Sequence, residues 1–417
     1  MFDNLTTTEK SELLVAEQAK YESYKAMNLS LDMSRGKPCS EQLDISMPLL
    51  DILTSKSTIK GAMDYRNYGI LDGIKELKGI FMDLLDLTAE EIIVAGNSSL
   101  NLMYDSIQRS MQFGIMGGEP FNKQGKIKWI CPVPGYDRHF GATEAFGIEL
   151  ISIAMTDEGP DMDAVSELIK DPSVKGMWCV PKYSNPQGIT YSDETVKKLA
   201  SMKPAAKDFR IYWDNAYMIH SLTGNKDKLL DILAEAKKAH NEDIVYMFGS
   251  TSKVTFPGSG VAFISGSVGN MADARKRMFD QTIGPDKINQ YAHYLFFKNA
   301  DGLQAHMDKH EKIIAPKFAK VIEILTAELT GIATWFNPKG GYFISCDLPE
   351  GTALETIKMV KDAGVIFTPA GSTFPYSIDP KDSNVRIAPT LPPIEELELA
   401  MKVYCCAAKI CALKKSM

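Results

Sequence analysis

The chain has 417 residues, of which 45% are hydrophobic and 24% charged, and its formal net charge at pH 7 is −7. This length is long for one hydrophobic core and fits two domains, and the composition is that of a soluble globular protein. The acidic charge argues against nucleic acid or an anionic membrane as the main partner.

The sequence also favours a cytoplasmic protein. No apolar run is long enough to cross a bilayer, and the first residues, MFDNLTTTEKSELL, lack the basic start and apolar stretch of a signal peptide. The seven cysteines are odd in number and scattered, and no two form a C-x-x-C pair, so we expect reduced thiols. They are Cys39, Cys131, Cys179, Cys346, Cys405, Cys406 and Cys411.

The chain opens with a capping box, in which Thr6 and Glu9 predict the start of a helix. The middle of the chain then alternates short apolar, β-branched runs with helix-like segments. The predicted strands are 91–95, 128–133, 149–154, 175–180, 210–213, 244–248 and 261–265, and predicted helices include 102–112, 162–170, 193–202 and 226–240. This alternation predicts an α/β fold with a mostly parallel seven-stranded sheet and helices on both faces.

The pattern changes from about Lys287 onward. A long helical stretch, 306–329, precedes a strand-like segment, 341–348, and the two indicate a second, smaller α+β domain that the N-terminal segment joins. We therefore divide the chain into an N-terminal arm with part of the small domain (1–50), a large domain (51–295) and a small C-terminal domain (296–417).

The chemically distinctive residues gather directly after the predicted strands. These clusters are Gly96-Asn97-Ser98-Ser99, Pro134-Gly135-Tyr136, Asn185-Pro186-Gln187-Gly188, Asp214-Asn215-Ala216-Tyr217 and Ser250-Thr251-Ser252-Lys253. In an open parallel sheet, ligands bind outside the carboxyl ends of the strands. Five such clusters at one edge therefore predict a single site.

Each cluster alone has a functional and a purely structural interpretation. The GNSS turn leads into a helix start that could hold a phosphate or simply cap the helix. Asp214, at the end of an apolar strand, either needs a cationic partner or caps the next helix. Tyr136 and Tyr217 could contact a ring or belong to the core, and the Asn185 turn could be only a turn.

Lys253 favours the functional interpretation. A lysine at a buried strand end, among small residues, can lose its proton and act as an amine nucleophile. Its small neighbours leave room for a flat ligand, and their hydroxyls can bind an anionic group. A lysine that forms a Schiff base, a paired aspartate and a phosphate cup are together what pyridoxal 5'-phosphate (PLP) requires.

With these motifs in this order, the chain resembles the fold type I PLP enzymes, in particular class I aminotransferases of the aspartate aminotransferase kind. The resemblance runs over nearly the whole chain and rests on NYGILDGIKELK, GNSS, PGY, SNPQG, DNAY, STSK and VRIAPT. It implies PLP as cofactor, with Lys253, Asp214 and Tyr217 as catalytic residues. The cofactor contacts that it implies are Lys253, Asn97, Ser98, Ser99, Tyr136, Asn185, Asp214, Tyr217, Ser250, Ser252 and Tyr68.

The same resemblance implies how substrate is bound. Arg386 forks onto the substrate α-carboxylate, a role that suits guanidinium geometry. Asn185 binds the ring oxygen O3′ and also contacts substrate, Gly36 lies near the substrate entrance, and Arg35 is a further substrate contact. Tyr68 serves the site of the neighbouring subunit in this family, so we expect a homodimer.

One position departs from the family pattern. An arginine that binds the PLP phosphate usually follows the lysine by eight residues, and here that position is Val261, within KVTFPGSGVAF. The chain therefore resembles a sub-branch in which Tyr68, serines and backbone N–H groups must bind the phosphate.

The expected reaction is amino transfer between an amino acid and a 2-oxo acid. Aspartate or glutamate is the favoured donor, and its second carboxylate needs a cation, for which Arg35, Lys37 and Arg138 are candidates. Each of the three could equally be a surface charge. An alanine or aromatic aminotransferase and a PLP-dependent β-lyase of the same fold stay open.

Three other classes fit less well. A transcription regulator with an aminotransferase-like sensor domain needs a DNA-binding module, whereas only about 30 acidic, helical residues precede SRGKP. A nicotinamide dehydrogenase would need a third glycine after Gly258-Ser259-Gly260. His306 and His310 have the helix-face spacing of metal ligands but lack the glutamate of a zinc protease, so we expect a solvated helix face there and no metal site.

Overall fold

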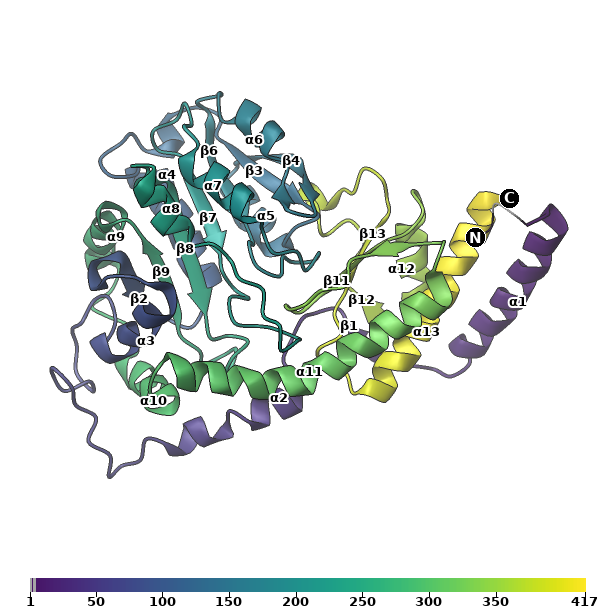
Figure 1. The fold of residues 1–417 in the computed structure, drawn as a ribbon, viewed down its shortest axis with the longest axis horizontal. Coiled ribbons are helices and arrows are strands. Elements are labelled where there is room, and N and C mark those ends of the chain that lie inside the picture. The colour runs from purple at the N-terminus through teal and green to yellow at the C-terminus, as the bar shows by residue number, and fades with distance from the viewer. Residues whose placement is uncertain (1, 3–4) are drawn as a thin grey trace.

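The computed structural model describes residue 2 and residues 5–417. Its strands form an eight-stranded sheet and two smaller sheets, which lie in different parts of the molecule (Figure 1). The strands of the large sheet are β2 (Ile92–Val94), β3 (Lys128–Val133), β4 (Glu149–Thr156), β5 (Gly159–Pro160), β6 (Val174–Cys179), β7 (Arg210–Asp214), β8 (Val245–Ser250) and β9 (Ala262–Gly266).

The strand order in this sheet is β2-β9-β8-β7-β6-β3-β4-β5. The five consecutive strands from β8 to β4 run parallel, and the pairings at the two ends, β2–β9, β9–β8 and β4–β5, are antiparallel. All seven predicted strands are present, and the predicted α/β class is confirmed. The eighth strand, β5, has only two residues, too few for a period-2 pattern to reveal.

Helices cover both faces of this sheet. Successive residues of a strand point to opposite sides, so apolar side chains lie on both faces and each face needs a helical layer to bury them. Ile92 and Val94 pack in one hydrophobic cluster and Ile93 between them packs in another. The first cluster takes in residues from α3 (Lys75–Leu85), α6 (Met162–Leu168), α7 (Asp193–Ser201) and α8 (Ile232–Lys238). The second takes in residues from α4 (Ser99–Phe113), α5 (Asp137–Glu144) and α9 (Val268–Gln281).

The remaining elements pack around a third cluster. Its sheets are β10 (Thr334–Trp335), β11 (Ile344–Asp347) and β13 (Asn384–Ile387) in one, and β1 (Leu31–Met33) with β12 (Val365–Phe367) in the other. Its helices are α1 (Thr7–Lys25), α12 (Ala353–Asp362), α13 (Ile394–Ser416) and the second half of α11 (Ala300–Leu329). The N-terminal segment thus pairs with the C-terminal part through β1 and β12, which are parallel.

Helix α11 connects the two parts of the molecule. Figure 1 shows it running from α10 (Lys287–Phe297) and α2 (Ser40–Asp44) toward α13. Its first half supplies Leu303 and Met307 to a large-sheet cluster, and its second half supplies Ile314 to Leu329 to the C-terminal cluster. Short 3-10 turns at Met47–Asp51, Ala89–Glu91, Phe121–Lys123, Glu242–Ile244 and Pro375–Ser377 complete the elements.

Local sequence signals account for several element ends. The predicted capping box is formed, since the Thr6 hydroxyl accepts from the Glu9 amide and the Glu9 side chain accepts from the Thr6 amide. The predicted helix 226–240 is shorter in the structure, because α8 starts only after Asp231, whose carboxylate caps it. Among the described residues, no helix is long and apolar enough to cross a membrane.

Candidate active site

The predicted site residues meet in one pocket of about 440 Å³ beyond the carboxyl ends of the parallel strands. Asp214 is the last residue of β7, and Lys253 lies in the loop after β8. Of the predicted residues, the pocket is lined by Arg35, Gly36, Ser98, Ser99, Tyr136, Asn185, Asp214, Tyr217, Ser250, Ser252, Lys253 and Arg386. Segments that are hundreds of residues apart in sequence thus converge at this edge, as the topology requires.

The Lys253 amine lies among aromatic rings. Its Nζ atom is 5.1 Å from the centroid of the Tyr217 ring and 5.8 Å from that of Tyr342. Burial lowers the pKa of Lys253 below its usual value, while the Asp214 carboxylate opposes this shift and Arg386 adds to it. A lysine with a lowered pKa is neutral for more of the time, which is the state in which an amine attacks a carbonyl carbon.

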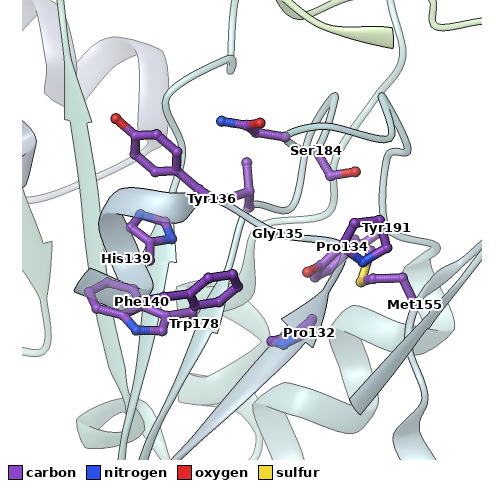
Figure 2. Close-up of a pocket in the computed structure, with 12 residues that line it drawn as sticks. Pro132, Pro134, Gly135, Tyr136, His139, Phe140, Met155, Trp178, Ser184 and Tyr191 are labelled. Atoms are coloured by element: carbon purple, nitrogen blue, oxygen red, sulfur yellow. The ribbon is translucent and has the colours of Figure 1, made fainter. Parts of the chain in front are cut away.

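Asp214 is buried beside a histidine that the sequence did not reveal. Nε2 of His139 lies 2.9 Å from Oδ2 of Asp214, and the His139 ring stacks on Trp178 with ring centroids 4.2 Å apart. Figure 2 shows His139 between the Tyr136 ring and Trp178. The second oxygen of Asp214, Oδ1, is buried and has no hydrogen-bond partner within the described part of the chain. One carboxylate oxygen therefore stays free for a cationic N–H from a ligand.

The two pocket tyrosines keep their protons. Burial raises the pKa of Tyr217 well above its usual value and that of Tyr136 to about 12. Tyr217 is 3% exposed. Both phenols can therefore donate a hydrogen bond at neutral pH.

A hydroxyl-rich turn lies at the other end of the pocket, at the start of α4. The Ser98 side chain accepts from the Asn101 amide, so Ser98 does cap this helix. The Ser250 hydroxyl donates to Ser252, and the Ser252 hydroxyl donates to the carbonyl of Asn97. Free N–H groups of the 15-residue helix and neighbouring hydroxyls together favour an anion at this point.

Arg386, on β13, is buried in the wall of the pocket. Its Nη1 atom donates to Asp137 Oδ1 at 2.9 Å and to Asn185 Oδ1 at 3.3 Å, and its side chain is 2% exposed. Arg35 reaches the other oxygen of Asp137 at 3.4 Å. Asp137 thus bridges two arginines, and one of them, Arg386, is the predicted carboxylate clamp. The only sequence signal for Asp137 is its position next to Tyr136.

The comparisons with known proteins agree with this geometry. The protein family described as aspartate amino-transferase matches residues 5–417. An aspartate aminotransferase from Corynebacterium glutamicum is 48% identical over 387 residues, which cover 92% of this chain and 89% of the relative. The chain belongs to the aspartate aminotransferase family.

Solved structures show the same fold for this aminotransferase. A crystal structure of an aspartate transaminase from Corynebacterium glutamicum is 44% identical, has a TM-score of 0.97 and covers 99% of each chain. An α-aminoadipate aminotransferase from Thermus thermophilus, complexed with N-(5'-phosphopyridoxyl)-L-leucine, is 19% identical with a TM-score of 0.76 and covers 93% of this chain and 94% of the other. The second likeness shows the fold, PLP transferase fold type I.

Two predicted cofactor contacts do not line the pocket of this aminotransferase. The Asn97 side chain donates to the carbonyl of Gly258, so within this chain only its backbone carbonyl contacts the serine cluster. Tyr68 is 76% exposed, as a residue that serves another subunit would be. Their roles stay predictions.

The unusual residue at the arginine position is part of the core. Val261 is 1% exposed and packs in the same cluster as Ile74, Leu77 and Phe263. Its amide donates to Thr251 Oγ1 at 2.9 Å. The side chain at this position therefore points into the protein interior rather than into the pocket.

Gly36 lines the pocket at a position where a side chain would not fit. A Cβ atom at this position would lie 2.5 Å from the Phe343 ring, which is closer than such atoms approach one another. The Phe343 ring in turn lies 4.8 Å from the guanidinium carbon of Arg386. Gly36 thus lets the N-terminal arm lie against the residues around the clamp.

The expectation for His306 and His310 was wrong. They are 4% and 1% exposed, whereas their spacing suggested a solvated helix face distant from the other clusters. The first half of α11 packs against α2 and the lysine loop, so both rings face inward and contact the carbonyl of Val254. Helical spacing shows which residues share a face, but not what that face contacts.

Proposed function

We propose that this aminotransferase binds PLP in the pocket and transfers an amino group between aspartate or glutamate and a 2-oxo acid. The observation that carries the proposal is that Lys253, with its lowered pKa, and the unpartnered oxygen of Asp214 open onto one pocket. A pyridine N–H suits that oxygen, and a phosphate suits the serine turn at α4, so the residues present fit this group.

Different residues of the pocket would act on the cofactor ring and on the substrate Cα. PLP, when bound, supplies a ring that accepts electrons from the substrate Cα. Asp214, held by His139, would keep a proton on the ring nitrogen of this group, and Tyr217 and Asn185 would donate to its ring oxygen. Lys253 would hold the group covalently through Nζ, and the same amine, when free, would take up and return the proton of the substrate Cα.

The same pocket supplies residues for the cofactor phosphate and for the substrate α-carboxylate. Ser98, Ser99, Ser250, Ser252 and the amides that begin α4 bind the phosphate, with Asn97 and the partner's Tyr68 completing the set. Tyr136 packs on the ring, and Arg386 binds the α-carboxylate with two parallel N–H groups. Gly36 borders the entrance.

Three cations of the pocket are available for the second carboxylate of the substrate. Arg35 pairs with Asp137, and Lys37 lies 3.9 Å from Asp32, whereas Arg138 has no ion pair among the described residues. A single substitution of each to Gln should raise the KM for aspartate without raising that for alanine if that residue binds the distal carboxylate. The residue whose variant raises the KM for aspartate relative to the KM for alanine is the one that selects the substrate.

We further propose that the protein is a cytoplasmic homodimer. Each chain would be divided into an N-terminal arm with part of the small domain (1–50), a large domain (51–295) and a small C-terminal domain (296–417). The segment after Tyr68 lies against a second segment with exposed apolar residues, since a Cβ at Gly284 would lie 2.6 Å from the carbonyl oxygen of Gly69. Tyr68, Phe279 and Ile283 are 76%, 78% and 63% exposed, which supports a subunit interface nearby. The seven free, buried cysteines support a reducing compartment.

A spectroscopic scan tests the function. The purified protein with PLP is mixed with single amino acids, and the cofactor absorbance is followed together with the released 2-oxo acid. We expect aspartate and glutamate to convert the cofactor to its aminated form, which a 2-oxo acid then reverses. Loss of the amine as ammonia, without this return, would show a β-lyase instead.

Two variants complete this test. Lys253→Ala should lose both covalent PLP and turnover, because no other amine of this loop can replace Nζ. Lys358→Ala, which removes an exposed lysine of α12, should behave as wild type. A Lys253→Ala protein that still turned over would overturn the assignment.

A further inference from the structure

A buried polar cluster lies against the backbone of the lysine loop. It consists of Gln42 on α2, His306 and His310 on α11, and Tyr342 just before β11. These side chains are between 0% and 4% exposed, and none of them lines the pocket. The cluster joins the N-terminal arm, the connecting helix and the C-terminal part at one point.

The cluster converges on two successive carbonyl groups of the lysine loop. Nε2 of His306 lies 2.8 Å and Nε2 of His310 lies 2.9 Å from the carbonyl oxygen of Val254. The Tyr342 hydroxyl lies 3.4 Å from the carbonyl oxygen of Lys253. The backbone on both sides of the Lys253–Val254 peptide bond is therefore held by side chains from other elements.

The chemistry of the groups fixes the direction of each hydrogen bond. A carbonyl only accepts, so both histidines must donate from Nε2, and Nδ1 of His310 is left to accept from the Gln42 amide at 2.9 Å. The Gln42 amide also donates to the Tyr342 hydroxyl at 2.8 Å, and this hydroxyl then donates to Lys253. The two Nε2 atoms lie 3.1 Å apart because they share one acceptor.

Burial keeps both histidines in the neutral form that this arrangement needs. It lowers the pKa of His306 below its usual value and that of His310 to about 4, the second ring adding to the shift for His310. A neutral imidazole has one donor and one acceptor nitrogen, and in His310 both are used. The oxygen of Gln42 accepts from the Cys39 amide at 3.2 Å, which completes the chain of bonds.

We propose that Gln42, His306 and His310 are positioning residues for Lys253: the two histidines fix the carbonyl of residue 254, Gln42 fixes that of residue 253 through Tyr342, and together they direct the lysine side chain toward the pocket. None of the three lines the pocket. A side chain that must reach a reacting atom is positioned well only if the backbone that carries it cannot rotate. This inference rests on the proposed role of Lys253.

The test measures how fast the full-length, cofactor-free protein attaches PLP to Lys253, by borohydride trapping and mass spectrometry. His310→Leu removes both bonds of the ring, whereas His310→Gln keeps one donor and one acceptor. We expect attachment to be at least tenfold slower in His310→Leu and to return to within about threefold of wild type in His310→Gln.

A matched control separates positioning from general loss of stability. Asn270 is buried and, like His310, both accepts a side-chain hydrogen bond and donates to a backbone carbonyl, but it lies at the opposite end of β8. Asn270→Leu should lower Tm as His310→Leu does and leave the attachment rate unchanged.

Each outcome bears on the inference. Wild-type attachment rates in His310→Leu overturn it, as does equal slowing in Asn270→Leu. If His310→Leu does not fold, Tyr342→Phe, which removes only the hydroxyl on the Lys253 carbonyl, takes its place with the same expectation and the same outcome against it. A wild-type protein that attaches no PLP would instead contradict the proposed function.

Discussion

Nε2 of His139 and Oδ2 of Asp214 lie 2.9 Å apart, and both side chains are almost fully buried. His139 is in turn held against Trp178, with 8° between the ring planes. The carboxylate is therefore fixed from one side, and its unpartnered oxygen has a defined direction. This pair explains how a carboxylate can stay buried at the end of β7 before any ligand binds.

Removing His139 should therefore weaken cofactor binding. In His139→Ala neither oxygen of Asp214 has a partner among the described residues, so nothing keeps the carboxylate turned toward the ring nitrogen; loss of that well-aligned charged hydrogen bond, worth about 1–3 kcal/mol, should raise the Kd for PLP roughly 10- to 100-fold. An absorbance titration measures it. His139→Gln keeps a donor and should recover most of the affinity, and an unchanged Kd in His139→Ala would show that Asp214 needs no such partner.

The bridge from Asp137 to Arg386 predicts two effects of opposite sign. Asp137→Asn removes the charge that compensates a buried guanidinium, so the substrate-free protein should lose about 1–3 kcal/mol of stability. The freed guanidinium should bind a substrate carboxylate more tightly, and KM should fall several-fold. Denaturant midpoints and steady-state kinetics measure the two.

The control for this variant is an ion pair in solvent. The pair of Asp64 with Arg66 has side chains that are 41% and 68% exposed, so Asp64→Asn should change neither stability nor KM appreciably. A higher KM in Asp137→Asn would mean that Asp137 orients Arg386 rather than competing with the substrate.

Restoring the usual arginine should not help this chain. Val261→Arg would place a charged side chain among Ile74, Leu77 and Phe263, so we expect a loss of 3 kcal/mol or more and no gain in PLP affinity. Thermal unfolding and PLP titration test this. Ser259→Arg adds the same charge at an exposed loop position and should be tolerated; a stable Val261→Arg protein with tighter PLP binding would refute the expectation.

The lowered pKa of Lys253 predicts how stability depends on pH. Between the lowered pKa in the fold and the usual value of 10.5, the unfolded chain holds more protons, so the cofactor-free protein gains stability as pH rises. Lys253→Met removes this dependence and should be the more stable protein at pH 7, with the difference shrinking toward pH 10.5. Urea midpoints between pH 7 and 10 measure it.

A control variant shows whether the pH dependence of stability comes from the Lys253 amine. Lys358, on α12, has a side chain that is 67% exposed, and Lys358→Met should keep the wild-type slope of stability against pH. Parallel curves for wild type and Lys253→Met would show that the amine of Lys253 loses no solvation in the fold.

The strands illustrate what local pattern can predict. Six of the seven predicted strands are apolar runs, because a strand buried on both faces needs apolar side chains at successive positions, whereas β4 alternates between buried and exposed residues. Caps show the limit of the same signals, since they move helix starts away from where the periodicity places them. Asp231 starts α8 later than predicted, and Ser98 starts α4 three residues earlier than the predicted residue 102. The role proposed for Tyr68 depends on a second subunit, and within one chain its side chain is 76% exposed.

By itself, the sequence determined the fold class, because the strand and helix patterns are local in sequence. It also predicted Lys253 and Asp214 from motifs at strand ends and Arg386 from the family resemblance, and the three line one pocket. Only the tertiary structure decided the partners of these residues: His139 for Asp214, Asp137 for Arg386, and the buried histidines of α11 behind Lys253. Those partners come from other elements whose own sequence carries no mark of what they face. Packing chooses them, and periodicity shows only which side chains share a face.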